Sequence, residues 1–138
     1  MLFGKSLPIS SDSDGKQGLE RFVKELPLRN LAHLGDAVFE LHERERELLA
    51  APSVKKMHNK VVARVNSKEQ ARLLELIKPQ LSEAEQDIVR RGRNLKAANR
   101  RNVEQATLRQ ATAFEALIGY LYLTDENRLH QLLALTND

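Results

Sequence analysis

The 138-residue sequence contains no cysteine and no tryptophan, and aromatic residues make up only 4% of it. The absence of cysteine excludes disulfides, thiolate metal sites and a cysteine nucleophile, and it fits a reducing compartment. The scarcity of aromatics means that the core must be built mainly from aliphatic side chains. No apolar run is long enough to span a membrane, and the N-terminus lacks the charged-then-apolar pattern of a secretion signal. We therefore expect a soluble cytoplasmic protein.

Hydrophobic residues account for 41% of the chain and charged residues for 30%, which is enough apolar material for one core under a solvated surface. The formal net charge is only +3, but the charges are unevenly distributed. Basic residues dominate residues 54–64 and 86–101, whereas residues 36–49 are mainly acidic. Taken alone, each run is typical of a solvated helix face. Together they indicate a polyanionic partner and a site that could hold a cation.

The apolar residues follow a helical period almost throughout, with no sustained alternation of period two. Residues 1–18, rich in Ser, Gly and Asp, predict a flexible N-terminal arm, and residues 19–138 predict a single all-α domain. Pro27 opens a long helix. Its predicted core stripe consists of Leu31, Leu34, Val38, Leu41 and Leu48.

Capping signals predict the helices that follow. The N-terminal signals are Ser53 after Pro52, Ser67 with Gln70, and Ser82 with Glu85, and Gly92 is predicted to close the last of these three helices. Residues 93–103 predict an exposed basic loop. A strongly apolar helix is expected around residues 108–123, and a short amphipathic one at residues 127–135.

Two carboxylates do not fit a simple surface pattern. Asp36 lies in the middle of the long helix, opposite the leucine stripe, where an exposed polar residue is the simplest interpretation. However, Gly35 directly before it costs ~1 kcal/mol relative to Ala in a helix. That cost indicates that something packs or binds close to the backbone at this point.

Glu115 lies in residues 113–121, the most apolar stretch of the chain, beside the core stripe of its helix. A carboxylate in such a position is costly unless it is paired, hydrogen-bonded or bound to a cation. Gly119, one turn later on the same face, is expected to leave open space above it. A buried ion pair with Arg109 is the alternative explanation.

Two helical carboxylates, each beside a glycine, suggest an oxygen-ligand site for a hard divalent cation. Mg²⁺ usually keeps several waters and takes one or two protein carboxylates together with substrate phosphate. Hydrolysis of a phosphodiester suits such a site, because the metal activates a water and neutralises charge on the phosphate. With basic patches available to hold a polyanion, the chemistry points to a nuclease whose catalytic and metal-binding residues are Asp36 and Glu115.

Two segments resemble a known family. The sequence LAHLGDAVFE at residues 31–40 resembles the signature helix of the ribonuclease III catalytic domain, and TAFEALIGYLYL at residues 112–123 resembles its second catalytic helix. The runs RRGRN at residues 90–94 and VNSKEQA at residues 65–71 resemble the short Mini-ribonuclease III branch, which has this all-α domain and no double-stranded-RNA-binding domain. The resemblance covers about residues 19–135.

The resemblance implies a dimeric, helical ribonuclease III-type endonuclease domain. It implies that Asp36 and Glu115 hold Mg²⁺, for which Mn²⁺ could substitute, and that a homodimer cleaves double-stranded RNA. The Mini-ribonuclease III branch is known for trimming precursor 23S ribosomal RNA near its paired ends. The candidates for contacting the RNA backbone are Lys55, Lys56, His58, Lys60, Arg90, Arg91, Arg93, Asn94 and Lys96.

Several positions depart from the pattern of the larger ribonuclease III enzymes. Arg29, Ala32 and Thr112 stand where those enzymes have acids, although Ala32 and Thr112 are typical of the Mini-ribonuclease III branch. His33 replaces an aromatic residue of the family's dimer contact, and the loop at residues 95–102 is more basic than the branch pattern. An alternative is therefore a helical RNA-binding or ribosome-assembly protein without catalysis. A helical oligomerisation module is a third, weaker one.

Overall fold

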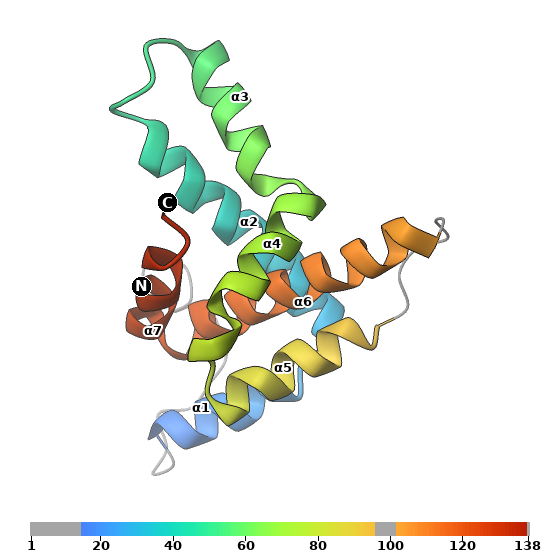
Figure 1. Ribbon diagram of the computed structural model, residues 1–138. Coiled ribbons are helices and arrows are strands. Elements are labelled where there is room, and N and C mark those ends of the chain that lie inside the picture. Colours follow the sequence, from blue (N-terminus) through green and yellow to red (C-terminus); the bar gives the residue numbers. More distant parts are fainter. Residues whose placement is uncertain (1–14, 96–101, 138) are drawn as a thin grey trace.

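The computed structural model describes residues 15–95 and 102–137, and within these residues the chain forms helices and no strand (Figure 1). This confirms the all-α prediction. The helices, in chain order, are α1 (Gly15–Lys24), α2 (Leu28–Glu47), α3 (Val54–Val65), α4 (Ser67–Ile77) with a 3₁₀ turn after it (Lys78–Gln80), α5 (Glu83–Arg93), α6 (Asn102–Thr124) and α7 (Glu126–Ala134).

Helix α6 is the centre of the fold and packs against α1, α2, α4, α5 and α7. Figure 1 shows α2 and α4 crossing it on opposite sides. The core is aliphatic, as expected, and includes one edge-to-face contact between Phe39 and Phe114, whose ring centroids lie 5.1 Å apart. No helix in the described part of the chain is both long and apolar enough to cross a membrane.

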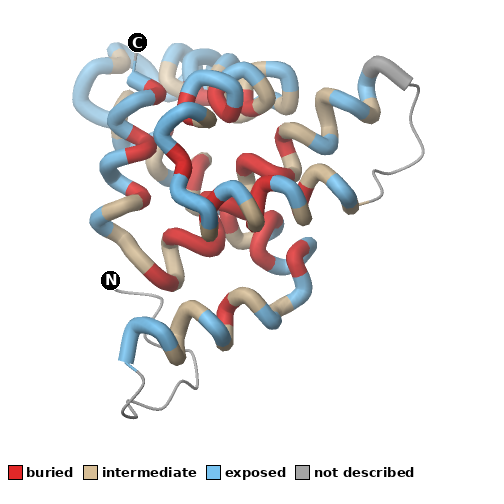
Figure 2. Tube along the Cα trace, turned by 60° about the horizontal axis from the view of Figure 1, so that its bottom comes forward, coloured by how far each residue is buried: buried red, intermediate tan, exposed pale blue. Residues whose placement is uncertain are grey.

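Buried residues gather where the helices cross α6, whereas α3 and the end of α2 project from the body with mostly exposed residues (Figures 1 and 2). Val61 is the only residue of α3 that is buried. This projecting part is therefore held by few apolar contacts, and its lysines Lys55, Lys56 and Lys60 are exposed to solvent.

The buried face of α2 differs from the predicted leucine stripe. Leu31 is buried as expected, but Leu34 and Val38 are only half-buried and Leu41 is 50% exposed. The buried residues of α2 are Leu28, Leu31, Ala32, Gly35, Phe39 and Glu43. The prediction was wrong because α6 covers the side of α2 that carries Ala32 and Gly35, whose small side chains add little to a hydrophobic pattern.

The capping predictions were partly right. Ser53 and Ser82 cap α3 and α5, and Ser82 forms a complete capping box with Glu85. The cap of α4, however, is Asn66, whose side chain accepts a hydrogen bond from the backbone N–H of Glu69 at 2.9 Å. Gly92 does not close α5 but lies inside it, where a Cβ atom would come within 2.7 Å of the Ala113 Cα.

The remaining differences between the predicted and the observed structure concern where helices begin and end. Helix α1 begins at Gly15, so the predicted boundary of the arm at residue 18 falls inside a helix, and residues 1–14 lie outside the described residues. The predicted loop at residues 93–103 is shorter at both ends, because α5 extends through Arg93 and α6 begins at Asn102. Residues 96–101 of that loop are not described.

Two buried glutamates tie the outer elements to the body. Glu43 of α2 accepts hydrogen bonds from Arg46 and from Arg64 of α3 at 2.9 and 3.0 Å. Glu85 of α5 forms a two-bond pair with Arg128 of α7, at 2.8 and 2.9 Å. These pairs fix α3 to α2 and α7 to α5, in regions where the apolar core is thin.

Replacing Arg128 by Ala is expected to lower the free energy of unfolding by about 2–3 kcal/mol, because it leaves the Glu85 carboxylate, 5% exposed, without its charged partner. Burial raises the pKa of Glu85, but hydrogen bonds from Arg128 and from the Ser82 N–H outweigh it and hold the pKa below its ordinary value of 4.5. The stabilisation is therefore complete above pH 4.5 and is lost as the pH falls through the lowered pKa.

Urea unfolding of wild type and R128A between pH 3 and pH 7 measures this effect, and the two curves should converge at the acid end. The matched control is R90A, because Arg90 forms an exposed pair with Asp87 on the surface of α5. Equal losses in R90A and R128A would contradict the buried role of the Glu85 pair.

Candidate active site

The structure brings the two predicted carboxylates together. Asp36 comes from the middle of α2 and Glu115 from the middle of α6, where these two helices cross. The two carboxyl groups are close enough to interact through a hydrogen bond and through their charges. Asp36 is exposed and Glu115 is half-buried, so the pair lies at the surface end of the crossing, where a phosphate could reach it.

Two glycines allow the helices to approach this closely. A Cβ atom on Gly35 would lie 1.7 Å from the backbone carbonyl oxygen of Glu115, and one on Gly119 would lie 2.0 Å from that of Leu31. The prediction that Gly35 marks a close approach to its backbone is confirmed. The expectation of open space above Gly119 was wrong, because the backbone of α2 fills that space.

The environment disfavours a second negative charge at this pair. Burial raises the pKa of Glu115, the neighbouring Asp36 raises it further through a hydrogen bond and through charge repulsion, and together they bring the pKa of Glu115 to about 8. At neutral pH, without a cation, Glu115 is therefore mainly protonated. A divalent cation between the two groups would remove the repulsion.

A third side chain, that of Gln70 on α4, contacts Glu115. It is 2% exposed, and its Nε2 donates to Oε2 of Glu115 at 3.5 Å. The sequence predicted Gln70 as the capping partner of Ser67, so this role was missed. The signal that could have found it is Asn66, which is as good an N-cap as Ser67 and directly precedes it. With Asn66 as the cap, the capped N–H is that of Glu69, and Gln70 is left free to point towards the core.

The alternative explanation for Glu115, a buried ion pair, does not hold, whereas Asp36 is exposed as its simplest interpretation expected. Arg109 is exposed and forms no ion pair with Glu115 within the described residues. Glu40, one turn beyond Asp36, pairs with Arg44 at 3.0 Å on the exposed side of α2. Ala32 is buried and Thr112 half-buried, so the positions where larger enzymes have acids add no charge to the pair.

The donor set fits a hydrated divalent cation. In the part of the chain that the structure describes, no group of three or more His, Asp or Glu residues could hold a metal ion. Mg²⁺ does not require such a group, because it keeps several waters and takes one or two carboxylates plus phosphate. Asp36 and Glu115 supply two carboxylates from two rigid helices, which matches that preference.

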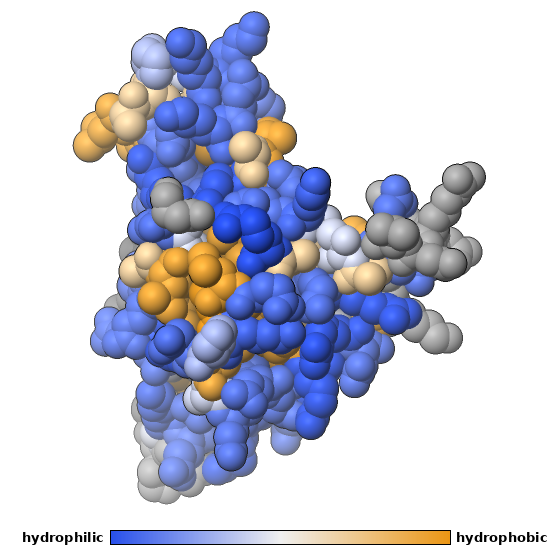
Figure 3. All heavy atoms as spheres, viewed as in Figure 1, coloured by the Kyte–Doolittle hydropathy of each residue, from blue (hydrophilic) through white to orange (hydrophobic). Residues whose placement is uncertain are grey.

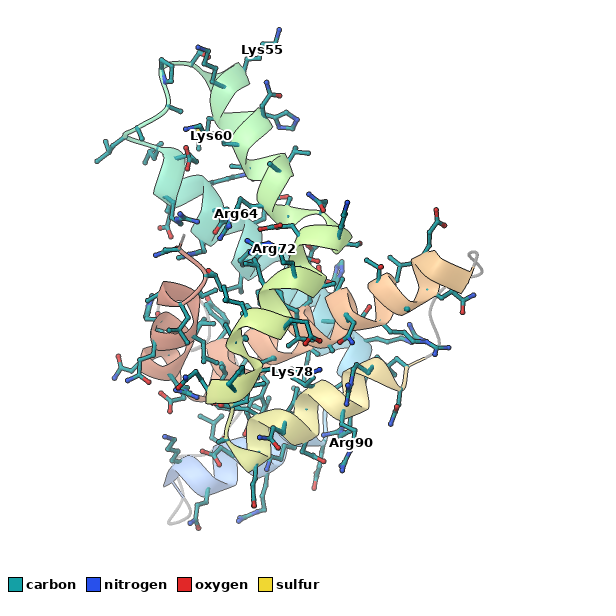
Figure 4. The ribbon with its side chains drawn as sticks, viewed as in Figure 1. Lys55, Lys60, Arg64, Arg72, Lys78 and Arg90 are labelled. Carbon is teal, nitrogen blue, oxygen red and sulfur yellow. The ribbon has the colours of Figure 1, made fainter. Side chains whose placement is uncertain are left out.

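The basic candidates all lie between Asp36 and Glu115 in the sequence, in two groups on α3 and at the end of α5. Figure 4 shows labelled basic side chains running from α3 through α4 to Arg90 of α5. On α3, Lys55, Lys56 and His58 are exposed, and Lys60 lies 3.7 Å from Glu47. His58 also lines a small apolar cavity between α3 and the end of α2.

The candidates on α5 differ from one another in their contacts. Arg90 is exposed and pairs with Asp87, an exposed ion pair of the kind that contributes little to stability and is available for exchange with phosphate. Arg91 is half-buried and donates to the backbone carbonyl of Lys24 at 3.0 Å, so it holds α1 in place. Arg93 and Asn94 lie at the C-terminal end of α5, and Lys96 lies outside the described residues.

The face seen in Figure 3 is mostly hydrophilic, in agreement with the basic side chains of Figure 4. Its main apolar area lies over α4 and α7. Leu76 of α4 and Leu135 at the end of α7 are each 45% exposed. A charged partner therefore meets a polar surface along α3 and α5 and an apolar one beside α7.

Comparison with known proteins places this arrangement in a family. The family model described as the ribonuclease III domain matches residues 29–126, a range that includes both carboxylates and Gln70. A protein named Mini-ribonuclease 3 from Gloeobacter violaceus is 45% identical over 84% of this chain and 86% of its own length. One of the same name from Thermoanaerobacter sp. is 44% identical over 77% of each chain.

A crystal structure of a Fusobacterium nucleatum protein has the same fold, with a TM-score of 0.75 and 29% identity over 83% of this chain and 95% of that one. The family match spans most of the chain, and the named relatives cover more than two thirds of it. Enzymes of the ribonuclease III family generally use divalent metal ions. The chain therefore belongs to the ribonuclease III family and is an endoribonuclease of the Mini-ribonuclease 3 type.

Proposed function

We propose that this endoribonuclease cleaves double-stranded RNA with Mg²⁺ and, in the cytoplasm, matures the paired ends of precursor 23S ribosomal RNA. The observation that carries the proposal is the contact between Asp36 and Glu115 at a crossing that two glycines fix. The choice of substrate is supported by the resemblance to the Mini-ribonuclease III branch and by the relatives of that name.

The proposed metal ligands are Asp36 and Glu115. When bound, Mg²⁺ or Mn²⁺ supplies a Lewis acid for the phosphate and a water of lowered pKa. The protein contributes the position of the two carboxylates, since both come from helices whose backbones are in direct contact. Few protein ligands are available here, so we expect weak metal binding that the RNA phosphate strengthens.

The proposed RNA contacts are basic and polar residues of α3 and of the end of α5, together with Lys96. They are Lys55, Lys56, His58, Lys60, Arg90 and Asn94, which are exposed, and Arg93, which is half-buried. Phosphate contacts dominate affinity for a duplex, and A-form RNA is recognised mainly by its shape. Arg91 contributes indirectly, because its hydrogen bond to the Lys24 carbonyl fixes α5 against α1.

We also propose that the enzyme acts as a homodimer that cuts both strands. The support is the outer face of α2, where Leu34, Val38 and Leu41 form an apolar row that the described part of the chain leaves partly uncovered. A second copy of the same helix would cover this row. One carboxylate pair per subunit would then give one cut in each strand.

The test is to incubate the purified protein with a long RNA duplex in Mg²⁺, in Mn²⁺ and in chelator, with the single strand of the same sequence as control. We expect fragments from the duplex in either metal, none in chelator and few from the single strand. A duplex built from the paired ends of precursor 23S RNA should be cut at fewer, better-defined positions. Binding without cleavage in every condition would favour the ribosome-assembly alternative.

A further inference from the structure

Gln70 is a buried polar residue whose side-chain amide donates one hydrogen bond within the described residues. It lies in the first turns of α4, and its backbone N–H is bonded to the Asn66 carbonyl at 3.0 Å. Its side chain is turned towards α6, and within the described residues the only hydrogen bond that its Nε2 donates goes to Oε2 of Glu115. A buried amide N–H without a partner is costly, so this contact is one that the fold maintains.

The two partners of Glu115 come from different helices. Asp36 belongs to α2 and is exposed, whereas Gln70 belongs to α4 and is buried. A glutamate side chain has three rotatable bonds, so the attachment of Glu115 to α6 does not by itself fix its two oxygens. The Nε2 of an amide donates hydrogen bonds and does not accept them, so through this atom Gln70 is a partner for a carboxylate oxygen.

The backbone of Gln70 is well fixed. Asn66 caps α4 at its start, and Leu73, Leu74 and Ile77 of the same helix are fully buried in the core around α6. Groups that hold a catalytic side chain are effective when they come from rigid, packed elements. Gln70 meets this condition, because the same face of α4 carries both the amide and the core contacts.

We infer that Gln70 is a positioning residue of the active site: its buried amide holds the Glu115 carboxylate in the orientation that faces Asp36 and binds the metal. This inference rests on the proposed function, since it assigns Gln70 a role only through Glu115. Loss of the residue that hydrogen-bonds a metal-ligating carboxylate typically lowers metal affinity or activity by 10–100-fold.

The test compares Q70M, which keeps the side-chain length and removes the donor, with L74V on the same face of α4, one turn further along. Mn²⁺ binding is measured without RNA by electron paramagnetic resonance, and kcat and KM are measured on a duplex. We expect Q70M to weaken Mn²⁺ binding and to lower kcat by about tenfold each, with KM for RNA little changed. L74V should lower the unfolding temperature and leave both quantities near wild type.

A second measurement needs no variant. Adding Mg²⁺ to ¹⁵N-labelled wild type should shift the side-chain amide resonance of Gln70 and leave that of Gln86, on α5, in place.

A third test combines the two substitutions. In a protein that already carries E115Q, Q70M should cause no further loss of Mn²⁺ binding.

The outcomes separate the inference from the function on which it rests. Wild-type Mn²⁺ binding and kcat in Q70M, with E115Q inactive, would overturn the role of Gln70 alone. An equal loss in L74V would overturn it too, because the effect would then come from packing. Normal cleavage by E115Q would overturn the proposed function itself.

Discussion

Replacement of Asp36 by Asn or of Glu115 by Gln is expected to lower kcat at least about a thousandfold while the protein stays folded. A thousandfold loss corresponds to about 4 kcal/mol of transition-state stabilisation, which is the scale of a metal ion's charge at a reacting phosphate. Each substitution keeps the shape of the side chain and removes one of only two carboxylates that the described residues place at the site. Single-turnover cleavage of a duplex, with the enzyme in excess, measures the effect.

Although activity is expected to fall, the E115Q variant is expected to be more stable than wild type at neutral pH. Because burial and the neighbouring Asp36 raise the pKa of Glu115 from 4.5 to about 8, the native protein prefers this group protonated. In chelator, wild type is therefore expected to lose stability as the pH rises from about 4.5 through about 8, and E115Q is expected to lack this loss. An active site that is less stable than its inactive variant is a common sign of function.

The matched control for these two variants is E40Q. Glu40 lies on α2 one turn beyond Asp36, and its carboxylate pairs with Arg44 at the surface. We expect E40Q to cleave at nearly the wild-type rate, because the pair contributes little and does not touch Glu115. Full activity in D36N or E115Q would contradict the metal site, as would an equal loss in E40Q.

The sequence predicted the elements of this fold better than their contacts. Helix starts could be predicted from Ser53 and from Ser82 with Glu85, because a cap is a local property of a few neighbouring residues. The buried face of α2 could not be predicted, because it depends on which side α6 covers. The hydrophobic pattern predicted that Leu41 is buried, but in the structure Leu41 is 50% exposed and the side of α2 that carries Gly35 is buried.

For the candidate site, too, individual residues could be predicted from the sequence but their contacts could not. Glu115 could be selected from the sequence because a carboxylate in an apolar helix is costly, and Asp36 because the glycine beside it is costly inside a helix. That they meet could not be derived from periodicity, since it requires the crossing angle of two helices. Gln70 escaped notice because an amide in a helix is inexpensive and common, and only the fold turns it towards Glu115.

Substitution of Gly35 or Gly119 by Ala is expected to cause a large loss of stability, greater than the same substitution at Gly15 or Gly92. At Gly35 and Gly119 the new Cβ would overlap a backbone oxygen of the other helix, at 1.7 and 2.0 Å, and no rotamer change relieves a backbone overlap. The helices must therefore move apart. Overpacking costs about 1–3 kcal/mol where side chains can adjust, and more is expected here, against a gain of ~1 kcal/mol in helix propensity.

We expect G35A and G119A to unfold at least about 10 °C below wild type in chelator, where no bound metal compensates. Activity should fall more steeply than stability, because separating α2 from α6 also separates Asp36 from Glu115. Circular dichroism melting and duplex cleavage at a temperature where each variant is still folded measure the two effects independently.

The control is A37G, an exchange in the reverse direction at an exposed position of α2, two residues from Gly35. It should cost only the ~1 kcal/mol of helix propensity, since nothing packs against that side of the helix in the described part of the chain. A G35A protein as stable as wild type would mean that the two helices do not touch at their glycines. The contact between Asp36 and Glu115 would then need another cause.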